Sequence, residues 1–307
     1  MPKWIPERPL YRREWLIVGY PTAAVFVLLF LARLLGEKLA LSGYLWFSLL
    51  CTVLAFLLPS LVFCLLRGKG YLRALRLSRP RTFHIPFLLS ALFALWSGAM
   101  LLSILCGGTS SLGNSTTAFE SASGSGFFRI IGMGISLAIL PALLEEFFFR
   151  GILVAEYERR GAVRAVVMSA LLFALCHFDI RNLPVYLFSG ALFALVLLAT
   201  DSLVSSMLLH AVYNTASLFG QRYLNALYDF TGSLELFIFL LILVFLVSMI
   251  LLCQTGAALY RRREQEQAPT PRRNVPWQVQ FYTILDALSD PPLIFAFLLS
   301  IVGFILL

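Results

Sequence analysis

The chain has 307 residues, of which 60% are hydrophobic and 13% are charged, and its formal net charge is +8. Soluble domains carry about 25% charged residues, so this composition excludes an ordinary water-soluble protein. The positive charge does not indicate nucleic-acid binding, because the Lys and Arg residues lie mostly beside hydrophobic runs, where membrane orientation explains them. Composition therefore predicts an integral membrane protein whose solvent is the lipid bilayer.

Apolar runs recur along the chain at the length that a membrane helix needs, about 20 residues. Backbone amides in a bilayer must be paired within a helix or a closed barrel, and these runs lack the alternation of barrel strands. The predicted fold is all-α, a polytopic transmembrane helical bundle with about eight or nine spans. The proposed spans are residues 15–35, 44–66, 85–105, 127–153, 163–178, 183–200, 203–219, 234–252 and a shorter 292–307.

The first region, residues 1–126, is predicted to hold N-terminal transmembrane helices and a basic cytoplasmic loop. Its first apolar run is longer than a signal-peptide core and has no cleavage site after it, so we interpret it as an uncleaved span. Residues 70–79 alternate Leu with Arg, which suits either a short helix on an anionic leaflet or a solvated loop. Residues 107–126 contain no Lys or Arg and are expected to form an external loop.

Basic residues mark alternate loops. Residues 67–81 hold six basic residues, residues 159–164 hold three, residues 261–273 hold five, and four more precede Trp15. Because Lys and Arg concentrate in short cytoplasmic loops, the N-terminus is predicted to be cytoplasmic. The expected location is a bacterial plasma membrane, which the protein crosses several times.

The second region, residues 127–222, is predicted to be the catalytic core. Ionisable side chains within a span cost about 2.5–3.5 kcal/mol each, so Glu145 and Glu146 need a reason to be there. Glu146 and Arg150 are four residues apart and can pair, whereas Glu145 lies about 100° around the helix with no local basic partner. The interpretation is that Glu145 is left available for chemistry. The alternative is that both glutamates join interhelical hydrogen bonds.

Two of the three histidines lie inside apolar runs. His177 ends the run that begins at Phe173, and His210 precedes Asn214 by four residues, which places imidazole and carboxamide on one helical face. A lone histidine in a membrane helix can also serve only for packing. Together with Glu145, however, these side chains could converge on one polar pocket within the bundle.

Such a pocket suits attack of water on a carbonyl. A carboxylate withdrawn from water is a strong proton acceptor, one histidine can hold the water, and a second histidine with an asparagine can donate to the oxyanion. A serine mechanism is less well supported because the GxSxG elbow is absent, and the zinc-protease HExxH pattern is absent too. The residues therefore predict a hydrolytic reaction in which an activated water attacks a carbonyl group.

A catalytic zinc ion is the rival interpretation, with His177, His210 and Glu145 as its ligands. No Asp or Glu is spaced to support either histidine, since Glu146 is expected to be occupied by Arg150. With Glu145 as a ligand, no other acid would be placed to take the proton from the attacking water. We therefore expect no metal and no other cofactor.

Three motifs follow one another in the core: Glu-Glu-x-x-x-Arg from Glu145, Phe-x-x-x-His from Phe173 and His-x-x-x-Asn from His210. In this order they resemble the CAAX-protease and bacteriocin-processing family, the type II CAAX prenyl endopeptidase-like and lysostaphin-resistance-type membrane proteases. The likeness extends to residues 149–151, Gly190 and residues 201–205, and it covers roughly residues 127–219.

The resemblance implies an intramembrane endopeptidase with a glutamate-activated water and a cavity that opens toward the cytosol. By that likeness Glu145 and His177 would handle the water, and His210 and Asn214 would stabilise the oxyanion. The residues with supporting roles would be Glu146, Arg150 and Phe173. The implied partner is a peptide or protein substrate at the membrane, which the sequence does not identify further.

The third region, residues 223–307, is predicted to hold one transmembrane helix, a polar linker at residues 265–276 and a last short helix. Two other functions stay open. Buried Glu and His residues also occur in transporters and ion-coupled carriers, although no repeated half is visible here. A catalytically silent scaffold or immunity protein would keep the bundle without needing the pocket.

Overall fold

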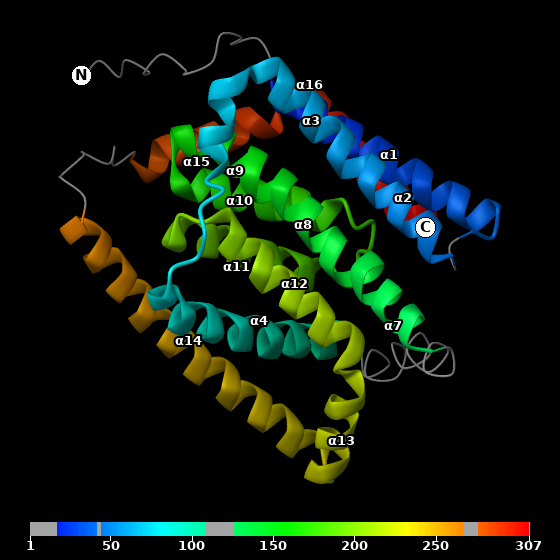
Figure 1. The fold of residues 1–307 in the computed structure, drawn as a ribbon, viewed down its shortest axis with the longest axis vertical. Coiled ribbons are helices and arrows are strands. Elements are labelled where there is room, and N and C mark those ends of the chain that lie inside the picture. Colours follow the sequence, from blue (N-terminus) through cyan, green and yellow to red (C-terminus); the bar gives the residue numbers. More distant parts are fainter. Residues whose placement is uncertain (1–16, 42–43, 108–125, 267–275, 307) are drawn as a thin grey trace.

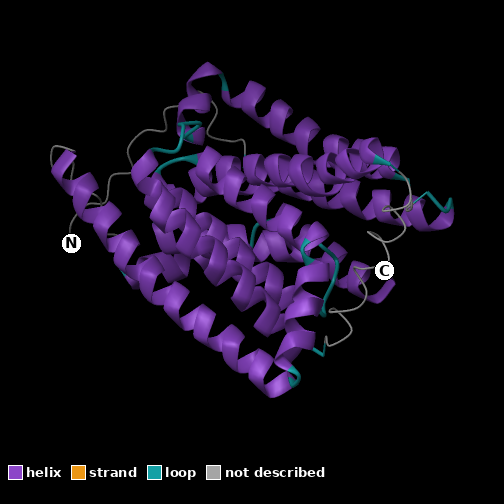
Figure 2. Cartoon of the chain, turned by 60° about the horizontal axis from the view of Figure 1, so that its bottom comes forward, coloured by secondary structure: helices purple, strands orange, loops and turns teal. Residues whose placement is uncertain are grey.

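A computed structural model describes residues 17–41, 44–107, 126–266 and 276–306. Within these ranges every regular element is a helix, which confirms the all-α prediction (Figure 2). Most of the predicted external loop at residues 107–126 and of the polar linker at residues 265–276 lies outside the described residues.

The described helices account for all nine predicted spans. Two of them, α10 and α12, have only 14 and 17 residues and are short for a crossing. A pair of C-terminal helices, bent by 70° at a short break, counts as a further span if it is taken as one unit. Six helical stretches are long and apolar enough to cross a membrane by themselves: Gly19–Lys38, Leu45–Arg67, Thr82–Leu105, Arg129–Arg160, Leu183–Thr200 and Leu234–Gln265.

The N-terminal region begins with α1 and continues through a second helical rod that contains a wider, π-helical turn. A short 3-10 segment then leads across the end of the bundle to α4. In chain order these elements are α1 (Gly19–Lys38), α2 (Leu45–Thr52), η1 (Val53–Leu57), α3 (Leu58–Arg67), η2 (Lys69–Leu75), η3 (Thr82–His84) and α4 (Ile85–Leu105).

The core begins with one long, segmented helix that includes two π-helical stretches, and three shorter helices pack against it. These elements are α7 (Phe127–Met133), η4 (Gly134–Ile139), α8 (Leu140–Glu146), η5 (Phe147–Leu153), α9 (Val154–Tyr157), η6 (Glu158–Arg160), α10 (Ala162–Leu175), α11 (Leu183–Thr200) and α12 (Leu203–Phe219). A π-helical turn often marks a functional position, and η5 starts directly after the paired glutamates.

The C-terminal region adds helices around the core, of which α13 and α15 were not predicted. They are α13 (Gln221–Thr231), α14 (Leu234–Glu266), α15 (Trp277–Leu288) and α16 (Pro291–Leu306). Helix α14 runs beside α4, and α16 packs along α1 (Figure 1). The predicted last helix is therefore present, and it is held against the first.

Close packing of α10 on α11 brings the core helices together. A Cβ atom added to Gly190 would lie 2.9 Å from the Cα of Ala170, so only glycine allows this approach. Helix α10 ends at Leu175, three residues before the predicted end of its span, and the chain turns there with Phe178 at a positive φ of 49°. The turn places His177 at the end of the short helix.

The two ends of the bundle differ in charge. The basic segments around η2, around η6 and at the end of α14 lie at the same end (Figure 1). The ends of α1 and α4 and the start of α7 lie at the opposite end. Loops predicted to share the cytosolic side thus occur together, while the side of the membrane that they face stays a prediction.

Candidate active site

Glu146 is the centre of a buried hydrogen-bond network. Its side chain is fully buried and accepts from three donors on two helices: Arg150 Nη1 donates to Oε1 over 2.7 Å, His210 Nδ1 donates to Oε1 over 2.9 Å, and Ser206 Oγ donates to Oε2. The predicted pairing of Glu146 with Arg150 is therefore present. Both carboxylate oxygens accept from protein donors, so this side chain is fixed inside the bundle.

Arg150 links the network to two other helices. Its Nη2 donates to the carbonyl oxygen of Gly190 on α11 over 3.0 Å. Its guanidinium carbon lies 4.4 Å from the ring centroid of Phe173 and 5.1 Å from that of Phe193. A buried guanidinium is stabilised by such a combination of carboxylate, carbonyl and aromatic faces. Arg150 thus fixes α8, α10 and α11 relative to one another.

His210 reaches both glutamates, one through each ring nitrogen. Because the Glu146 carboxylate pairs with Arg150 and can only accept, the Nδ1 proton of His210 must be donated to it. The opposite nitrogen, Nε2, lies 4.0 Å from Oε2 of Glu145. The ring stacks on Phe193 with centroids 4.3 Å apart, which fixes its plane. His210 can therefore donate through Nε2 only as an imidazolium cation.

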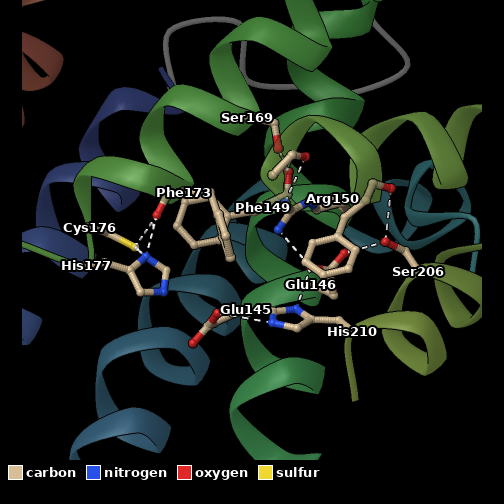
Figure 3. Close-up of polar contacts among 12 residues, drawn as sticks. Glu145, Glu146, Phe149, Arg150, Ser169, Phe173, Cys176, His177, Ser206 and His210 are labelled. Carbon is tan, nitrogen blue, oxygen red and sulfur yellow. Dashed lines mark hydrogen bonds and ion pairs between the residues drawn. The ribbon is translucent and has the colours of Figure 1, made fainter. Parts of the chain in front are cut away.

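Glu145 points into a cavity rather than into the network. Its side chain keeps 14% of its surface exposed, and its Oε2 lies 4.0 Å from the Nε2 of His210. Glu145 and His177 both line a cavity of about 420 Å³ that is closed on the other side by α1, α2 and η1. Figure 3 shows the Glu145 carboxylate between the two imidazoles. The neighbouring glutamates therefore have different surroundings, as the sequence predicted.

The ring of His177 is held so that one nitrogen stays free. Its Nδ1 lies 2.7 Å from the carbonyl oxygen of Phe173, an atom that can only accept, so Nδ1 carries a proton. The ring stacks on Tyr186 with centroids 3.9 Å apart and an interplanar angle of 17°. In its neutral form His177 therefore presents an unprotonated Nε2, which can accept a hydrogen bond from water.

Phe173 separates the two imidazoles. Its ring centroid lies 4.8 Å from that of His177 and 5.8 Å from that of His210. The same ring carries the Arg150 guanidinium on its face. The Phe-x-x-x-His motif is thus explained physically, since the phenyl ring spaces the histidines while its own carbonyl fixes the tautomer of one of them.

Asn214 lies one turn beyond His210 and away from the cavity lining. Its amide nitrogen is 3.5 Å from the carbonyl oxygen of Ala138 on η4, longer than a usual hydrogen bond. Ala138 precedes Glu145 by seven residues, or about 10 Å along a helix axis. Glu145, His177 and His210 are brought together, whereas the carboxamide of Asn214 points toward the start of the same long helix.

One argument against zinc was wrong. Glu146 does support His210, because its carboxylate accepts from Arg150 and from the imidazole at once. Both histidines thus have Nδ1 occupied, as zinc-binding histidines usually do. Among the residues that the structure describes, however, no three His, Cys, Asp or Glu side chains are grouped so that they could hold one metal ion.

The cavity begins at the end of the bundle opposite the arginine-rich segments. Its lining includes Gly36 and Glu37 in the last turn of α1 and Phe47 and Ser48 in the first turns of α2, and it extends inward to Glu145. If the basic segments face the cytosol, this end faces away from it. The predicted orientation and the cytosolic opening implied by the family resemblance therefore cannot both be correct.

Three side chains of the site were missed in the sequence. Ser206 lies four residues before His210 and could have been found by the same helical spacing that identified Asn214. Tyr186, which stacks on His177, and Arg33, which lines the cavity, carry no local signal. They lie on α11 and α1, and no nearby residue indicates which parts of the bundle these helices contact.

Comparison with known proteins covers the segment that carries Glu145, His177 and His210. Residues 127–216 match the family model described as type II CAAX prenyl endopeptidase Rce1-like. The membrane-embedded CAAX protease MroQ of Staphylococcus aureus (strain USA300) is 31% identical over 85 residues, which make up 25% of this chain and 34% of that relative. No solved structure matches the chain.

Proposed function

We propose that this protein is an intramembrane endopeptidase that uses a water activated by Glu145, because residues 127–216 match the family model described as type II CAAX prenyl endopeptidase Rce1-like. The observation that supports the proposal most directly is the asymmetry of the two glutamates. Both carboxylate oxygens of Glu146 accept from buried donors, while Glu145 faces the cavity beside an imidazole with a free nitrogen.

The reaction begins with a water held between Glu145 and Nε2 of His177. The carboxylate takes a proton as the water oxygen bonds to the carbonyl carbon of the scissile peptide bond, whose electron pair moves onto oxygen. When this tetrahedral intermediate collapses, the C–N bond breaks and the protonated Glu145 returns its proton to the departing amine. Atoms and charge balance without a covalent intermediate.

Stabilisation of the oxyanion is assigned to His210 and Asn214. His210 donates through Nε2 as an imidazolium, while Nδ1 stays bonded to Glu146. The amide of Asn214 is held by one long contact to Ala138, so a rotation of the side chain frees it to donate. Glu146, Arg150 and Phe173 hold these groups in place without touching the substrate.

The substrate is proposed to be a peptide or protein segment that reaches the cavity from within or beside the membrane. The cavity wall combines apolar side chains such as Leu29, Phe47 and Phe56 with polar ones, and Arg33 and Glu37 lie near its shallow end. Such a lining suits an extended apolar segment with polar groups at one end. The proposed location is a bacterial plasma membrane.

The first test compares peptide termini in cells that carry the wild-type protein or the Glu145→Gln variant. Removing a general base while keeping the side-chain shape lowers proteolysis by roughly 100- to 10,000-fold. Proteomics of membrane and secreted peptides should find termini that depend on wild-type protein and vanish in the variant. The matched control is Glu264→Gln, which changes an exposed glutamate remote from the cavity.

A folded Glu145→Gln protein with full cleavage would refute the glutamate-water mechanism. Termini unchanged by expression of the wild-type protein would favour a transporter or a silent scaffold. Metal dependence is tested separately with the purified protein in detergent. Activity that persists after exhaustive chelation supports metal-free catalysis, whereas activity lost on chelation and restored by stoichiometric zinc contradicts it.

A further inference from the structure

A second pocket, lined by a different set of residues, lies at the arginine-rich end of the bundle. It has a volume of about 300 Å³ and is formed by the segment from η2 to η3, the end of α11 and the last turns of α14. Its lining includes one carboxylate, that of Asp201. The six arginines in the lining are Arg73, Arg76, Arg79, Arg81, Arg262 and Arg263.

The single carboxylate is shared and does not neutralise the pocket. Oδ1 of Asp201 lies 3.0 Å from Nε of Arg76 and 3.1 Å from Nη2 of Arg263. Arg76 is also paired with Glu158. Arg73 and Arg79 are exposed, and neither side chain has a hydrogen bond or ion pair within the described part of the chain. The pocket therefore keeps a cationic excess that an anionic ligand would satisfy.

One wall of the pocket is an aromatic ring covered by a guanidinium. The carbon atom of the Arg262 guanidinium lies 3.9 Å from the ring centroid of Phe83. Stacking of this kind holds a guanidinium in place while its edge stays able to bind oxygen atoms in its plane. Arginine forks of this kind match the two free oxygens of a phosphate group.

The pocket lies where one candidate membrane span begins and another ends. Phe83 belongs to the first turn of the span Thr82–Leu105, and Arg262 lies in the last turns of Leu234–Gln265. Next to the pocket residues in sequence, Leu77 and Ile85 expose 52% and 51% of their surface. Cationic groups and exposed apolar side chains thus occur together, as recognition of a lipid headgroup and its acyl chains requires.

We propose that this pocket binds the phosphate of an anionic phospholipid headgroup. The phosphodiester oxygens are held by the arginines, and the acyl chains run over the exposed leucine and isoleucine. A soluble phosphate would share the headgroup chemistry but would not use the apolar surface beside it. The segment at residues 70–79, whose first part belongs to the short 3-10 helix η2, forms one wall of this proposed lipid site.

Hydrogen bonds connect the segment that lines the pocket to the start of α12, the helix that carries His210. The backbone N–H of Leu203 donates to the carbonyl oxygen of Arg76 over 2.9 Å, and Ser202 Oγ donates to that of Ser78. Ser78 Oγ in turn donates to the carbonyl oxygen of Asp201 over 2.8 Å. A headgroup that holds the arginines in place should therefore stabilise the junction with α12.

The test uses the purified full-length protein in a neutral detergent. Native mass spectrometry and thermal unfolding are measured with phosphatidylglycerol, with phosphatidylcholine, and with inorganic phosphate or glycerol phosphate at matched concentration. The pocket variant is Arg73→Gln/Arg79→Gln, which leaves both ion pairs of Asp201 intact. The control, Arg129→Gln/Arg261→Gln, removes two exposed arginines that are outside the pocket lining.

We expect phosphatidylglycerol to bind and raise the unfolding temperature more than phosphatidylcholine does, and the pocket variant to weaken that binding by about tenfold or more. The control variant should bind like the wild type, and the pocket variant should keep its stability in phosphatidylcholine. Equal effects of the two lipids, or equal losses in the two variants, would overturn the proposal. Full stabilisation by soluble phosphate alone would overturn the lipid assignment.

Discussion

Glu145 and Glu146 are adjacent in sequence, yet they belong to two physically different regions. The Glu146 region is a closed network in which Arg150, Ser206 and His210 occupy the carboxylate. The Glu145 region is an open cavity in which a partly exposed carboxyl group faces an imidazole. The Glu146 carboxylate is held by groups on other parts of the bundle, whereas the Glu145 carboxyl group is left open to the cavity.

Because of this difference, substitutions around Glu146 should lower the free energy of unfolding, whereas substitutions around Glu145 should lower the proposed proteolytic activity. A buried carboxylate with several donors cannot be removed without leaving those donors unpaired. A carboxylate at a cavity can be neutralised at little structural cost. His210 is where the two regions meet, because each of its nitrogens faces one of the glutamates.

The largest effect on stability is expected for Glu146→Gln, which leaves Arg150 as a buried charge without its counter-ion. We expect a loss of about 3–5 kcal/mol in the free energy of unfolding, measured as thermal or denaturant unfolding in detergent. Glu145→Gln is the matched control and should change stability by less than about 1 kcal/mol. Equal losses in both variants would remove the distinction between the two regions.

A smaller loss is expected for Ser206→Ala, which deletes one of the donors to the Glu146 carboxylate. The expected cost is about 1–3 kcal/mol, because the carboxylate oxygen stays buried with one partner fewer. Its neighbour provides the control: Ser205 Oγ is buried without a partner among the described residues. Ser205→Ala should therefore be neutral or slightly stabilising. A comparable loss in the two alanine variants would contradict this account of the network.

On the cavity side, Tyr186 should influence activity rather than stability. Replacing it by leucine removes the ring that stacks on His177, an interaction worth about 0.5–1.5 kcal/mol. Proteolysis should fall by up to about tenfold, since the imidazole is less well oriented. Tyr186→Phe keeps the stacking and should retain activity. If the phenylalanine variant lost as much activity as the leucine variant, the hydroxyl group and not the ring would matter.

The smallest effect on the protein is expected for exposed cysteine substitutions, whose labelling decides which side of the membrane the cavity end of the bundle faces. In a protein whose five native cysteines are replaced by serine or alanine, we expect a membrane-impermeant maleimide to label Tyr44→Cys in intact cells and not Leu77→Cys, because the arginine-rich end should face the cytosol. Both side chains are exposed, at opposite ends of the bundle. The reverse pattern would overturn the predicted orientation and restore the cytosolic opening that the family resemblance implied.

The sequence by itself determined the features that depend on local spacing. Hydrophobic runs of sufficient length predicted the helical bundle, and the four-residue interval predicted the pairing of Glu146 with Arg150. The contrast between the two glutamates followed from their positions around one helix. These are consequences of helical periodicity, which a sequence contains directly.

Only the tertiary structure decided which helical faces meet. Glu146 accepts from Ser206 and His210, which are 60 and 64 residues away, and no spacing rule connects them. The cavity before Glu145 is closed by α1 and α2, which lie outside residues 127–216. Asn214 follows His210 by four residues and lies on the same face of α12, but its amide contacts Ala138 and not the cavity. The packing of α12 on the long helix decides this contact, and the four-residue interval does not.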